Sequence, residues 1–348
     1  MGVEAWVGQQ NAAVTIPLTA PFTLEAARSR TGRSRTATAL AGLPAAMGLG
    51  LLSALFFSVS FVVNHGMALG GGPWEWSASL RFLMSLPVFA LIVAVRGGLG
   101  GVVRALGDAP WRWLVWSTVG FGLFYAPICL AAGFAPGWLV ASVWQVTIVC
   151  GMLVAPLLYR DRDRRRIPLA GLGLSAVVLA GVGLTVVQAP GGVGSGVLVG
   201  IAAVLVAAVA YPVGNRKSME LAGDGLDTFQ RLLALSLASL PWWIGLSALG
   251  LARTGLPDGA QVASTGIVAL SSGVIATALF FAATSRVRDN PLRLAAVEAT
   301  QAGEVMFVAL AEPLVLSTAP PGAVAWIGIA VITLGVLGYS FVGRRPTG

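Results

Sequence analysis

The sequence predicts an all-α integral membrane protein with ten transmembrane helices, arranged as two inverted five-helix repeats. Three observations lead to this prediction: an apolar composition, ten hydrophobic runs of span length, and basic residues gathered on one side. Of the 348 residues, 56% are hydrophobic and 10% are charged, and the mean hydropathy is +0.83. Soluble domains carry about 25% charged residues. A lipid bilayer is therefore the expected solvent of this chain.

Ten apolar runs follow one another along the chain, each near the roughly 20 residues that cross a bilayer. They lie at 46–67, 76–95, 112–134, 137–159, 168–187, 195–214, 228–251, 262–284, 295–316 and 322–342. These runs and their short loops leave no room for a separate enzymatic domain. The expected division is a disordered cytoplasmic tail at 1–45, a first repeat at 46–190, a second repeat at 191–343 and a cytoplasmic tail at 344–348.

The basic residues support the count of ten spans. An even number of spans puts both termini on one side, and 20 of the 22 Lys and Arg residues then fall on that side. Arg253 alone lies opposite, and Arg81 lies within a span. The positive-inside rule makes this side cytoplasmic, so we expect a multi-pass protein of the cell inner or plasma membrane. The net charge of +8 therefore reflects topology and not a nucleic-acid partner, since no single polar face collects the charge.

The two halves share features at a nearly constant offset. Residues 140–158 can be laid on 296–314 with Gln145 over Gln301, and Gly173 falls over Gly328 in the fifth and tenth runs. Because each unit holds an odd number of helices, the second copy must be inverted in the membrane, as in alternating-access transporters. The glycines of the fifth and tenth runs are interpreted as sites of close helix packing.

Four segments carry a resemblance to a known family. They are FFSVSFVVNHGM (56–67), WSASLRFLMSLP (76–87), SVWQ (142–145) and VEATQAGEVMFVALAEPL (297–314). Over roughly residues 46–343 the chain resembles the drug/metabolite transporter superfamily with its EamA-type repeats, in particular the multidrug resistance efflux transporter branch. The resemblance implies two inverted repeats around a central cavity and export of small organic compounds, often driven by protons. The Gly-Glu that usually ends the fourth helix of such a repeat is Ala311-Glu312 in the second half and Ala155-Pro156 in the first.

Four ionisable residues lie within the predicted spans: Arg81, Glu298, Glu304 and Glu312. A charge at mid-bilayer costs at least ~2.5–3.5 kcal/mol, so each is a functional candidate. Their sum of minus two favours a cation or a proton as ligand. The three glutamates and Gln301 form one polar stripe at helical spacing, which should face the interior of the bundle.

Each ionisable residue has a functional and a structural interpretation. Glu304, at the centre of its span, is expected to couple transport to protons or to bind a cation; the alternative is a neutral acid hydrogen-bonded to another helix. Glu298 is a second proton-coupling candidate nearer the cytoplasmic edge, where it could simply be solvated. Arg81 and Glu312 are expected to form a structural ion pair in the outer half. Alternatively, Arg81 binds a substrate carboxylate.

The expected substrate-binding residues are Gln145, Trp144, Gln301, Glu304 and Asn64. The two glutamines occupy equivalent repeat positions, which would bring them together near the pseudo-twofold axis. Trp144 could offer an aromatic face to a cation, although simple packing is the commoner role. Five other tryptophans at span ends are interpreted as an interfacial belt: Trp74, Trp76, Trp111, Trp113 and Trp138.

The leading hypothesis is a secondary active transporter that exports a small organic solute, cationic or amphipathic, by proton-coupled alternating access, as a monomer or homodimer. The alternative is an exporter of amino acids or other metabolites that uses Arg81 for a carboxylate. A third hypothesis is an intramembrane enzyme or lipid-handling protein, disfavoured because the only histidine, His65, has no cluster of catalytic partners. We expect no catalytic residue, no metal, no cofactor and no ATP-driven transport, since nucleotide-binding and metalloprotease motifs are missing from the sequence.

Overall fold

The computed structural model describes residues 24–158, 169–223, 225–287 and 291–342. The chain forms two compact units, Met1–Gly42 and Leu43–Gly348, and the second contains the helical bundle. Helix α1 (Leu24–Leu69) begins well before residue 46, whereas the sequence predicted an irregular tail up to residue 45. Residues 1–23 and the tail at 344–348 lie outside the described residues.

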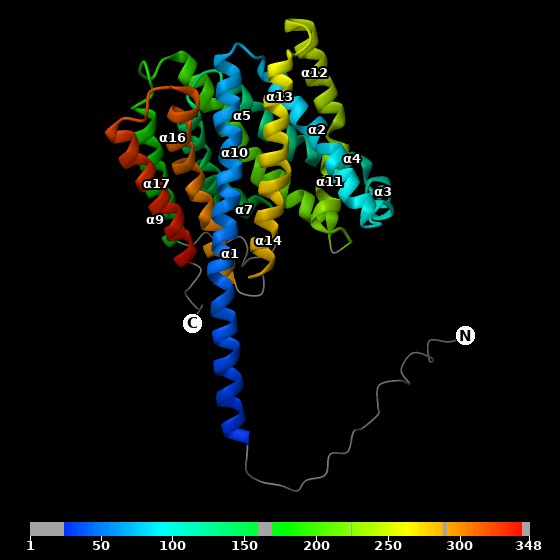
Figure 1. Cartoon of the computed structure of the whole chain (residues 1–348), viewed down its shortest axis with the longest axis vertical. Helices are drawn as coiled ribbons and strands as arrows, with labels where there is room; N and C mark the ends of the chain where they lie inside the picture. The colour runs from blue at the N-terminus through cyan, green and yellow to red at the C-terminus, as the bar shows by residue number, and fades with distance from the viewer. Residues whose placement is uncertain (1–23, 159–168, 224, 288–290, 343–348) are drawn as a thin grey trace, which may run out of the picture. The chain divides into compact units, whose positions relative to one another are not determined.

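All elements in the described ranges are helical (Figure 1). After α1 the first half contains α2 (Trp74–Val95), α3 (Leu99–Asp108), α4 (Pro110–Ser117), η2 (Thr118–Gly122), α5 (Leu123–Ala131), α6 (Gly137–Trp144), α7 (Val146–Leu158) and α9 (Leu169–Val186). The second half contains α10 (Ser195–Ala222), α11 (Thr228–Ala238), α12 (Leu240–Thr254), α13 (Gly259–Val268), η3 (Ala269–Ala276), α14 (Thr277–Ser285), α15 (Pro291–Ala299), η4 (Thr300–Ala302), α16 (Gly303–Leu316) and α17 (Ala323–Val342).

Within the described residues, seven helical segments are long and apolar enough to cross a membrane, and an eighth results if the bent pair α11–α12 counts as one span. The pair bends by 47° where α12 begins with Leu240-Pro241, because proline lacks the N–H that would continue the helix. Two further apolar helices, Ala170–Val186 and Ala323–Gly338, are shorter. The predicted all-helical membrane fold is thus confirmed, with seven or eight candidate spans.

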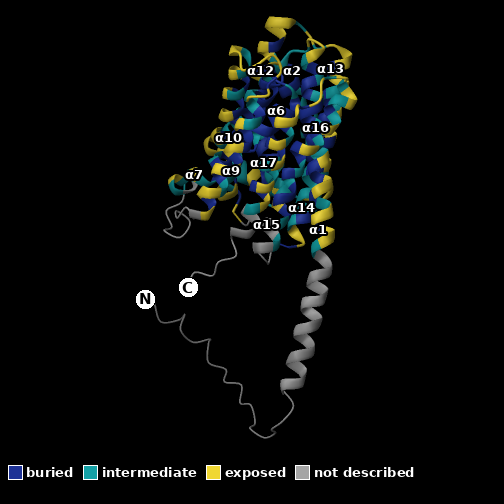
Figure 2. Cartoon of the chain, turned by 90° about the vertical axis from the view of Figure 1, so that its left-hand side faces the viewer, coloured by how far each residue is buried: buried dark blue, intermediate teal, exposed yellow. Residues whose placement is uncertain are grey.

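The outer faces of the bundle are apolar. Leu157 and Leu314 each expose 83% of their surface, and Val95 exposes 80%. Figure 2 shows such exposed residues on the outer faces of the helices, with buried residues along the inner faces. Contiguous exposed apolar surface is unfavourable in water but matches acyl chains, which agrees with a bilayer around these helices.

Several spans are interrupted within the bilayer. A π-helix, η2, lies between α4 and α5, and a second, η3, lies between α13 and α14. Helix α6 ends at Trp144, and α7 starts after Gln145, while the 3-10 turn η4 contains Gln301. Such irregular turns expose backbone groups and are frequent at functional sites. The interruptions therefore direct attention to the side chains beside them.

Helices α9 and α17 pack closely through glycine. A Cβ atom added to Gly181 would lie 2.8 Å from the carbonyl oxygen of Gly328, and one added to Gly328 would lie 2.7 Å from that of Gly181. Only glycine allows this approach of two backbones. The interpretation as packing sites is thus confirmed for Gly181 and Gly328, whereas Gly173, which the repeat alignment used, faces open space.

Candidate solute-binding site

Three aromatic rings from different helices meet inside the bundle. Phe124 of α5 lies 5.1 Å from Trp144 at the end of α6 and 4.8 Å from Tyr211 of α10, measured between ring centroids. Trp144 and Tyr211 are 5.5 Å apart in an edge-to-face arrangement. These spacings are typical of favourable ring pairs. We call Phe124, Trp144 and Tyr211 the aromatic cluster; Tyr211 keeps 37% of its surface exposed, so the cluster has a free face.

Local structure positions this cluster. Trp144 is the last residue of α6, directly before the break at Gln145, so the end of the helix directs the indole. Phe124 follows the π-helix η2, in which Gly120 approaches Gly214 of α10 so closely that a Cβ on Gly214 would lie 2.2 Å from the Cα of Gly120. This glycine contact brings α10, and with it Tyr211, against the third span.

Glu304 is the buried acid of this region. It lies in the first turn of α16, directly after the 3-10 turn, and only 7% of its surface is exposed. The carboxylate interacts electrostatically with the phenol of Tyr211. Among the described residues, nothing donates a hydrogen bond to Glu304 and no cation pairs with it. A buried carboxyl group without a partner is costly and therefore suggests a ligand.

The structure brings only some of the expected substrate-binding residues together. The ring of Trp144 contacts that of Tyr211, whose phenol lies within electrostatic range of Glu304. Gln145 is buried and its amide lies 3.5 Å from the carbonyl oxygen of Ala141 in its own helix. Gln301 donates to the carbonyl oxygen of Gly50 in α1, over 3.0 Å. Each glutamine therefore hydrogen-bonds to a backbone carbonyl near its own helix break. No described hydrogen bond joins Gln145 to Gln301, which the sequence predicted to lie together.

Glu298 and Asn64 make no described contact with the rings of the aromatic cluster, although Glu298, like Glu304, lies within electrostatic range of the Tyr211 phenol. Glu298, in α15, has an exposed side chain, as expected for an acid close to the membrane surface. Asn64, in α1, donates from its amide nitrogen to the hydroxyl of Tyr125 over 3.1 Å and is buried. Asn64 is therefore held by Tyr125 and not by the residues of the aromatic cluster.

The expected ion pair between Arg81 and Glu312 is wrong. Glu312 is fully buried and accepts hydrogen bonds from the backbone N–H groups of Gly137 (2.8 Å) and Trp138 (2.7 Å), the first two residues of α6. Its third partner is Nδ1 of His65. A helix N-terminus offers unpaired N–H groups and a partial positive charge, so this carboxylate needs no arginine. His65 is thus a hydrogen-bonded histidine with a structural partner.

Arg81 makes different contacts. Its guanidinium carbon lies 4.1 Å from the ring centre of Tyr125 and 5.1 Å from that of Phe82, and Nη2 donates to Ser272 over 3.1 Å. Nε is buried, and no described group accepts its hydrogen. Stacking on a ring contributes about 0.5–2 kcal/mol. Arg81 therefore has ring and hydroxyl contacts but no described carboxylate partner.

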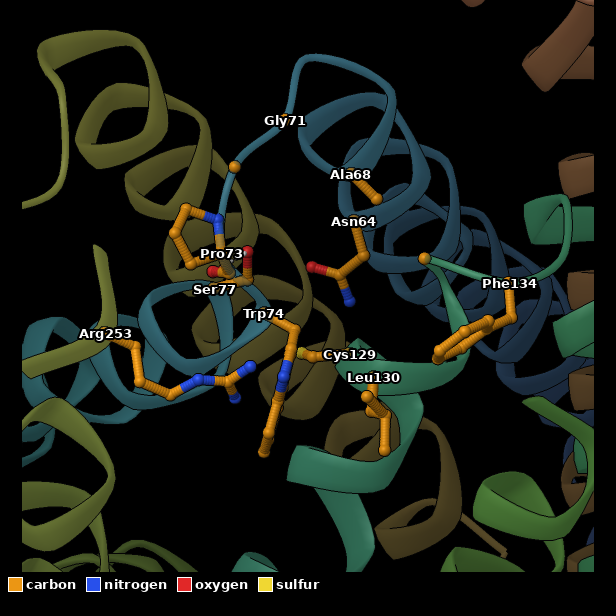
Figure 3. Close-up of a pocket in the computed structure, with 12 residues that line it drawn as sticks. Asn64, Ala68, Gly71, Pro73, Trp74, Ser77, Cys129, Leu130, Phe134 and Arg253 are labelled. Carbon is orange, nitrogen blue, oxygen red and sulfur yellow. Dashed lines mark hydrogen bonds between the residues drawn. The ribbon is translucent and has the colours of Figure 1, made fainter. Parts of the chain in front are cut away.

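A second feature is a cavity of about 440 Å³ at the end of the bundle where α1 turns into α2 (Figure 3). We call this cavity the vestibule. Asn64, Ser77, Cys129 and Arg253 supply polar atoms to its wall, and Trp74 and Phe134 supply aromatic surface. Arg253 also pairs with the buried Glu75 at 2.7 Å. The volume lies in the range of small-molecule sites.

Sequence reasoning missed four of these residues. Phe124 and Tyr125 of α5 and Tyr211 of α10 form ring contacts that no spacing rule predicts, because the two helices are far apart in the sequence. A usable signal was that tyrosine is rare here, four residues in all, and a tyrosine within a span needs a polar partner. Glu75 was missed because the second span was predicted to begin at residue 76, one position too late.

The fold and the site together define a class: a multi-spanning helical membrane protein with a buried acid, an aromatic cluster and a cavity of small-molecule size. Comparison with known proteins gives the family. Residues 45–345 match the family described as "EmrE: Putative multidrug resistance efflux transporter". The chain belongs to this family, within the drug/metabolite transporter superfamily, so the resemblance found in the sequence is confirmed. The family is one of transporters and not of enzymes.

Two relatives and one solved structure extend this comparison. The chain is 46% identical over 312 residues to "Uncharacterized protein YjlA" of Bacillus subtilis (strain 168), covering 86% of this chain and 96% of that protein. It is 46% identical over 264 residues to an "Uncharacterized 42.1 kDa protein in intracellular alkaline protease 3'region" of Shouchella clausii, covering 74% and 70%. A solved structure described as "Crystal structure of protein" has a TM-score of 0.61 at 18% identity, over 88% of this chain and 99% of that one; this likeness concerns the fold.

Proposed function

We propose that this protein is a secondary active transporter that exports a small organic cation, or an amphipathic solute with a cationic group, in exchange for protons. The observation that carries the proposal is Glu304, a buried acid without a described partner that lies within electrostatic range of the Tyr211 phenol in the aromatic cluster. Aromatic faces attract cations, and the carboxylate supplies the opposite charge. A solute with an apolar body and a positive group fits both.

The exchange follows from a single shared acid. A carboxylate in this low-dielectric region is neutralised either by a proton or by the cationic solute, and each excludes the other. Loading a proton would therefore release the solute, and loading the solute would release the proton. Glu298 is exposed at the end of α15, and its proposed role is to pass protons between Glu304 and the membrane surface.

The proposed architecture is ten spans in two inverted repeats. The seven long helices, the bent pair and the two shorter apolar helices together make ten candidate elements. The interruptions support the repeat: η2 and η3 interrupt the third and eighth elements, and the breaks at Gln145 and Gln301 interrupt the fourth and ninth. Discontinuous helices at corresponding positions are typical of inverted-repeat carriers.

Alternating access would then be a rocking of one half against the other around the aromatic cluster and Glu304. The positive-inside rule favours both termini in the cytoplasm and a location in the inner or plasma membrane. Because one chain supplies both repeats, a monomer holds a complete site, and a homodimer would carry two. The repeats at 46–190 and 191–343 are the proposed moving bodies.

The test is pH-driven flux in proteoliposomes with Glu304→Gln. Glutamine keeps the size of the side chain but can neither release a proton nor carry a negative charge. We expect the variant to be as abundant and monodisperse as the wild type and to lose flux of a cationic dye driven by a pH gradient. Glu220→Gln is the matched control, since Glu220 is exposed and pairs with Lys217 on the surface. Undiminished flux in Glu304→Gln would disprove the coupling role.

A second candidate function is export of amino acids or other carboxylated metabolites. One observation favours it: the Arg81 guanidinium has no described carboxylate partner. Comparing uptake of radiolabelled amino acids with that of cationic dyes in the same vesicles separates the two candidates.

A further inference from the structure

Arg81 carries a positive charge inside the second span, and no described carboxylate lies within ion-pair distance of it. Two other arginines of the chain do have carboxylate partners: Arg253 pairs with Glu75 at 2.7 Å and Arg96 with Asp227 at 3.2 Å. The guanidinium has five N–H groups, of which one donates to Ser272, and the Nε hydrogen has no described acceptor. The side chain is therefore equipped to bind a further anion.

The position of Arg81 connects it to the vestibule. Ser77 lines the vestibule, and Arg81 follows four residues later, on the same face of α2 and one turn deeper. The ring of Tyr125, over which the guanidinium stacks, is hydrogen-bonded to Asn64, and Asn64 and Cys129 form part of the vestibule wall (Figure 3). The Asn64–Tyr125 pair therefore connects the wall of the vestibule with the ring over which Arg81 stacks.

The charges around the vestibule also favour an anion. Arg253 stands in its wall, and its partner Glu75 is buried, with 2% of its surface exposed. The carboxylate of Glu312 is hydrogen-bonded to His65 and to the backbone N–H groups at the N-terminus of α6. Arg81 is therefore the charged group next to this cavity that has no described counter-ion.

We propose that Arg81 forms an oxyanion subsite at the floor of the vestibule, so that the exported solute carries a carboxylate or phosphate group in addition to its cationic group. This inference rests on the proposed function, which already places the cationic group at Glu304. The planar guanidinium binds two oxygens of such a group at once. Opening of the Asn64–Tyr125 hydrogen bond admits the anionic end from the vestibule. The substrate class is thus a small amphoteric molecule with an apolar body.

The experiment uses four matched probes in counterflow with the purified full-length chain in proteoliposomes. Benzylamine carries only the cation, and benzoate only the anion. The two amphoteric probes are 4-(aminomethyl)benzoate and 4-(aminomethyl)benzylphosphonate, which distinguish a carboxylate from a phosphate-type group. The variants are Arg81→Gln, Arg81→Lys and, as a matched control, Arg104→Gln, since Arg104 is exposed on α3.

In the wild type we expect at least one amphoteric probe to be transported faster than benzylamine. Arg81→Gln should lower the ratio of amphoteric to benzylamine flux about tenfold or more, because charged hydrogen bonds are lost. Arg81→Lys should restore part of the ratio, and Arg104→Gln should leave it unchanged. A wild-type ratio of one or less, or a ratio that Arg81→Gln does not change, overturns the inference. Benzylamine flux that depends on Glu304 would still support the proposed function in that case, so the two failures are distinguishable.

Discussion

Two glutamates on the same helix show how surroundings divide structural from functional roles. Glu304 and Glu312 both lie on α16, and both are buried, at 7% and 0% exposure. Glu312 receives two backbone N–H donors and His65, whereas nothing described donates to Glu304. A satisfied carboxylate stabilises the fold, and an unsatisfied one remains available to a proton or a solute. The sequence alone could not assign these roles, because both residues appear as acids within one span.

Glu312→Gln should destabilise the protein without changing its substrate preference. The amide oxygen can replace one carboxylate oxygen, but the amide NH2 cannot accept the second backbone hydrogen bond from α6. A buried donor left unsatisfied costs about 1–3 kcal/mol, so the thermal unfolding midpoint in detergent should fall. The exposed Glu220→Gln serves as the control. An unchanged midpoint would argue against the capping role of Glu312.

Trp144→Ala should weaken binding of a cationic solute. If the indole contributes a cation–π contact of about 0.5–2 kcal/mol, the dissociation constant should rise roughly 2- to 30-fold, and Trp144→Phe should retain most of the affinity. Calorimetric titration of a quaternary ammonium dye into the purified protein measures the change. Trp111→Phe, at a tryptophan that exposes 73% of its surface, should bind as the wild type does. Equal affinity in Trp144→Ala would remove the indole from the site.

Tryptophans also show where sequence reasoning fails at this scale. Trp76, Trp113 and Trp138 were interpreted as an interfacial belt from their places at span ends, but each is buried, at 7%, 1% and 2% exposure. Depth in the membrane can be read from a hydropathy pattern, whereas the direction of a side chain around the helix depends on neighbours that the pattern does not contain. Of these three and Trp111, also at a helix end, only Trp111 is exposed, at 73%.

At the scale of elements, the short helix α6 connects the surroundings of Glu312 with those of Glu304. Its N-terminus is held by Glu312 of α16, and its last residue, Trp144, enters the aromatic cluster. A Cβ on Gly137 would lie 2.8 Å from the carbonyl oxygen of Phe61 in α1, so α6 also packs tightly against the first span. Hydropathy is uniform across residues 140–158 and predicts a continuous helix. The hydropathy pattern therefore could not reveal the break at Gln145.

The packing of α9 on α17 makes a prediction with an internal control. Gly181→Ala would place a methyl group 2.8 Å from backbone atoms of α17, whereas Gly173, in the same helix α9, has nothing within 4 Å of the added Cβ. Overpacking typically costs about 1–3 kcal/mol. We expect Gly181→Ala to lower the unfolding midpoint and Gly173→Ala to leave it unchanged or raise it slightly, because alanine favours helix. Equal midpoints for the two variants would contradict this packing.

At the scale of the whole molecule, the membrane class and the family could be predicted from sequence because both depend on composition and on residues adjacent in the chain. The aromatic cluster and the vestibule could not, since each assembles side chains from three or more helices. Phe124, Trp144 and Tyr211, for example, come from α5, α6 and α10. Long-range contacts of this kind are fixed by tertiary packing and not by local periodicity.

Topology is the property on which the transport mechanism depends most directly, because only an even number of spans allows two inverted five-helix repeats with both termini on one side. Fusions of a periplasmically active phosphatase and a cytoplasmically fluorescent protein at matched positions measure it. Gly97, after α2, and Gly223, after α10, should report cytoplasm, as should the C-terminus. Gly71, Gly192 and Gly255 should report the opposite side. All five positions are turn glycines with positive φ, where an inserted linker disturbs no helix interior. A C-terminus that reports the same side as Gly71 would leave an odd number of crossings, and the second half could not then be the inverted copy of the first.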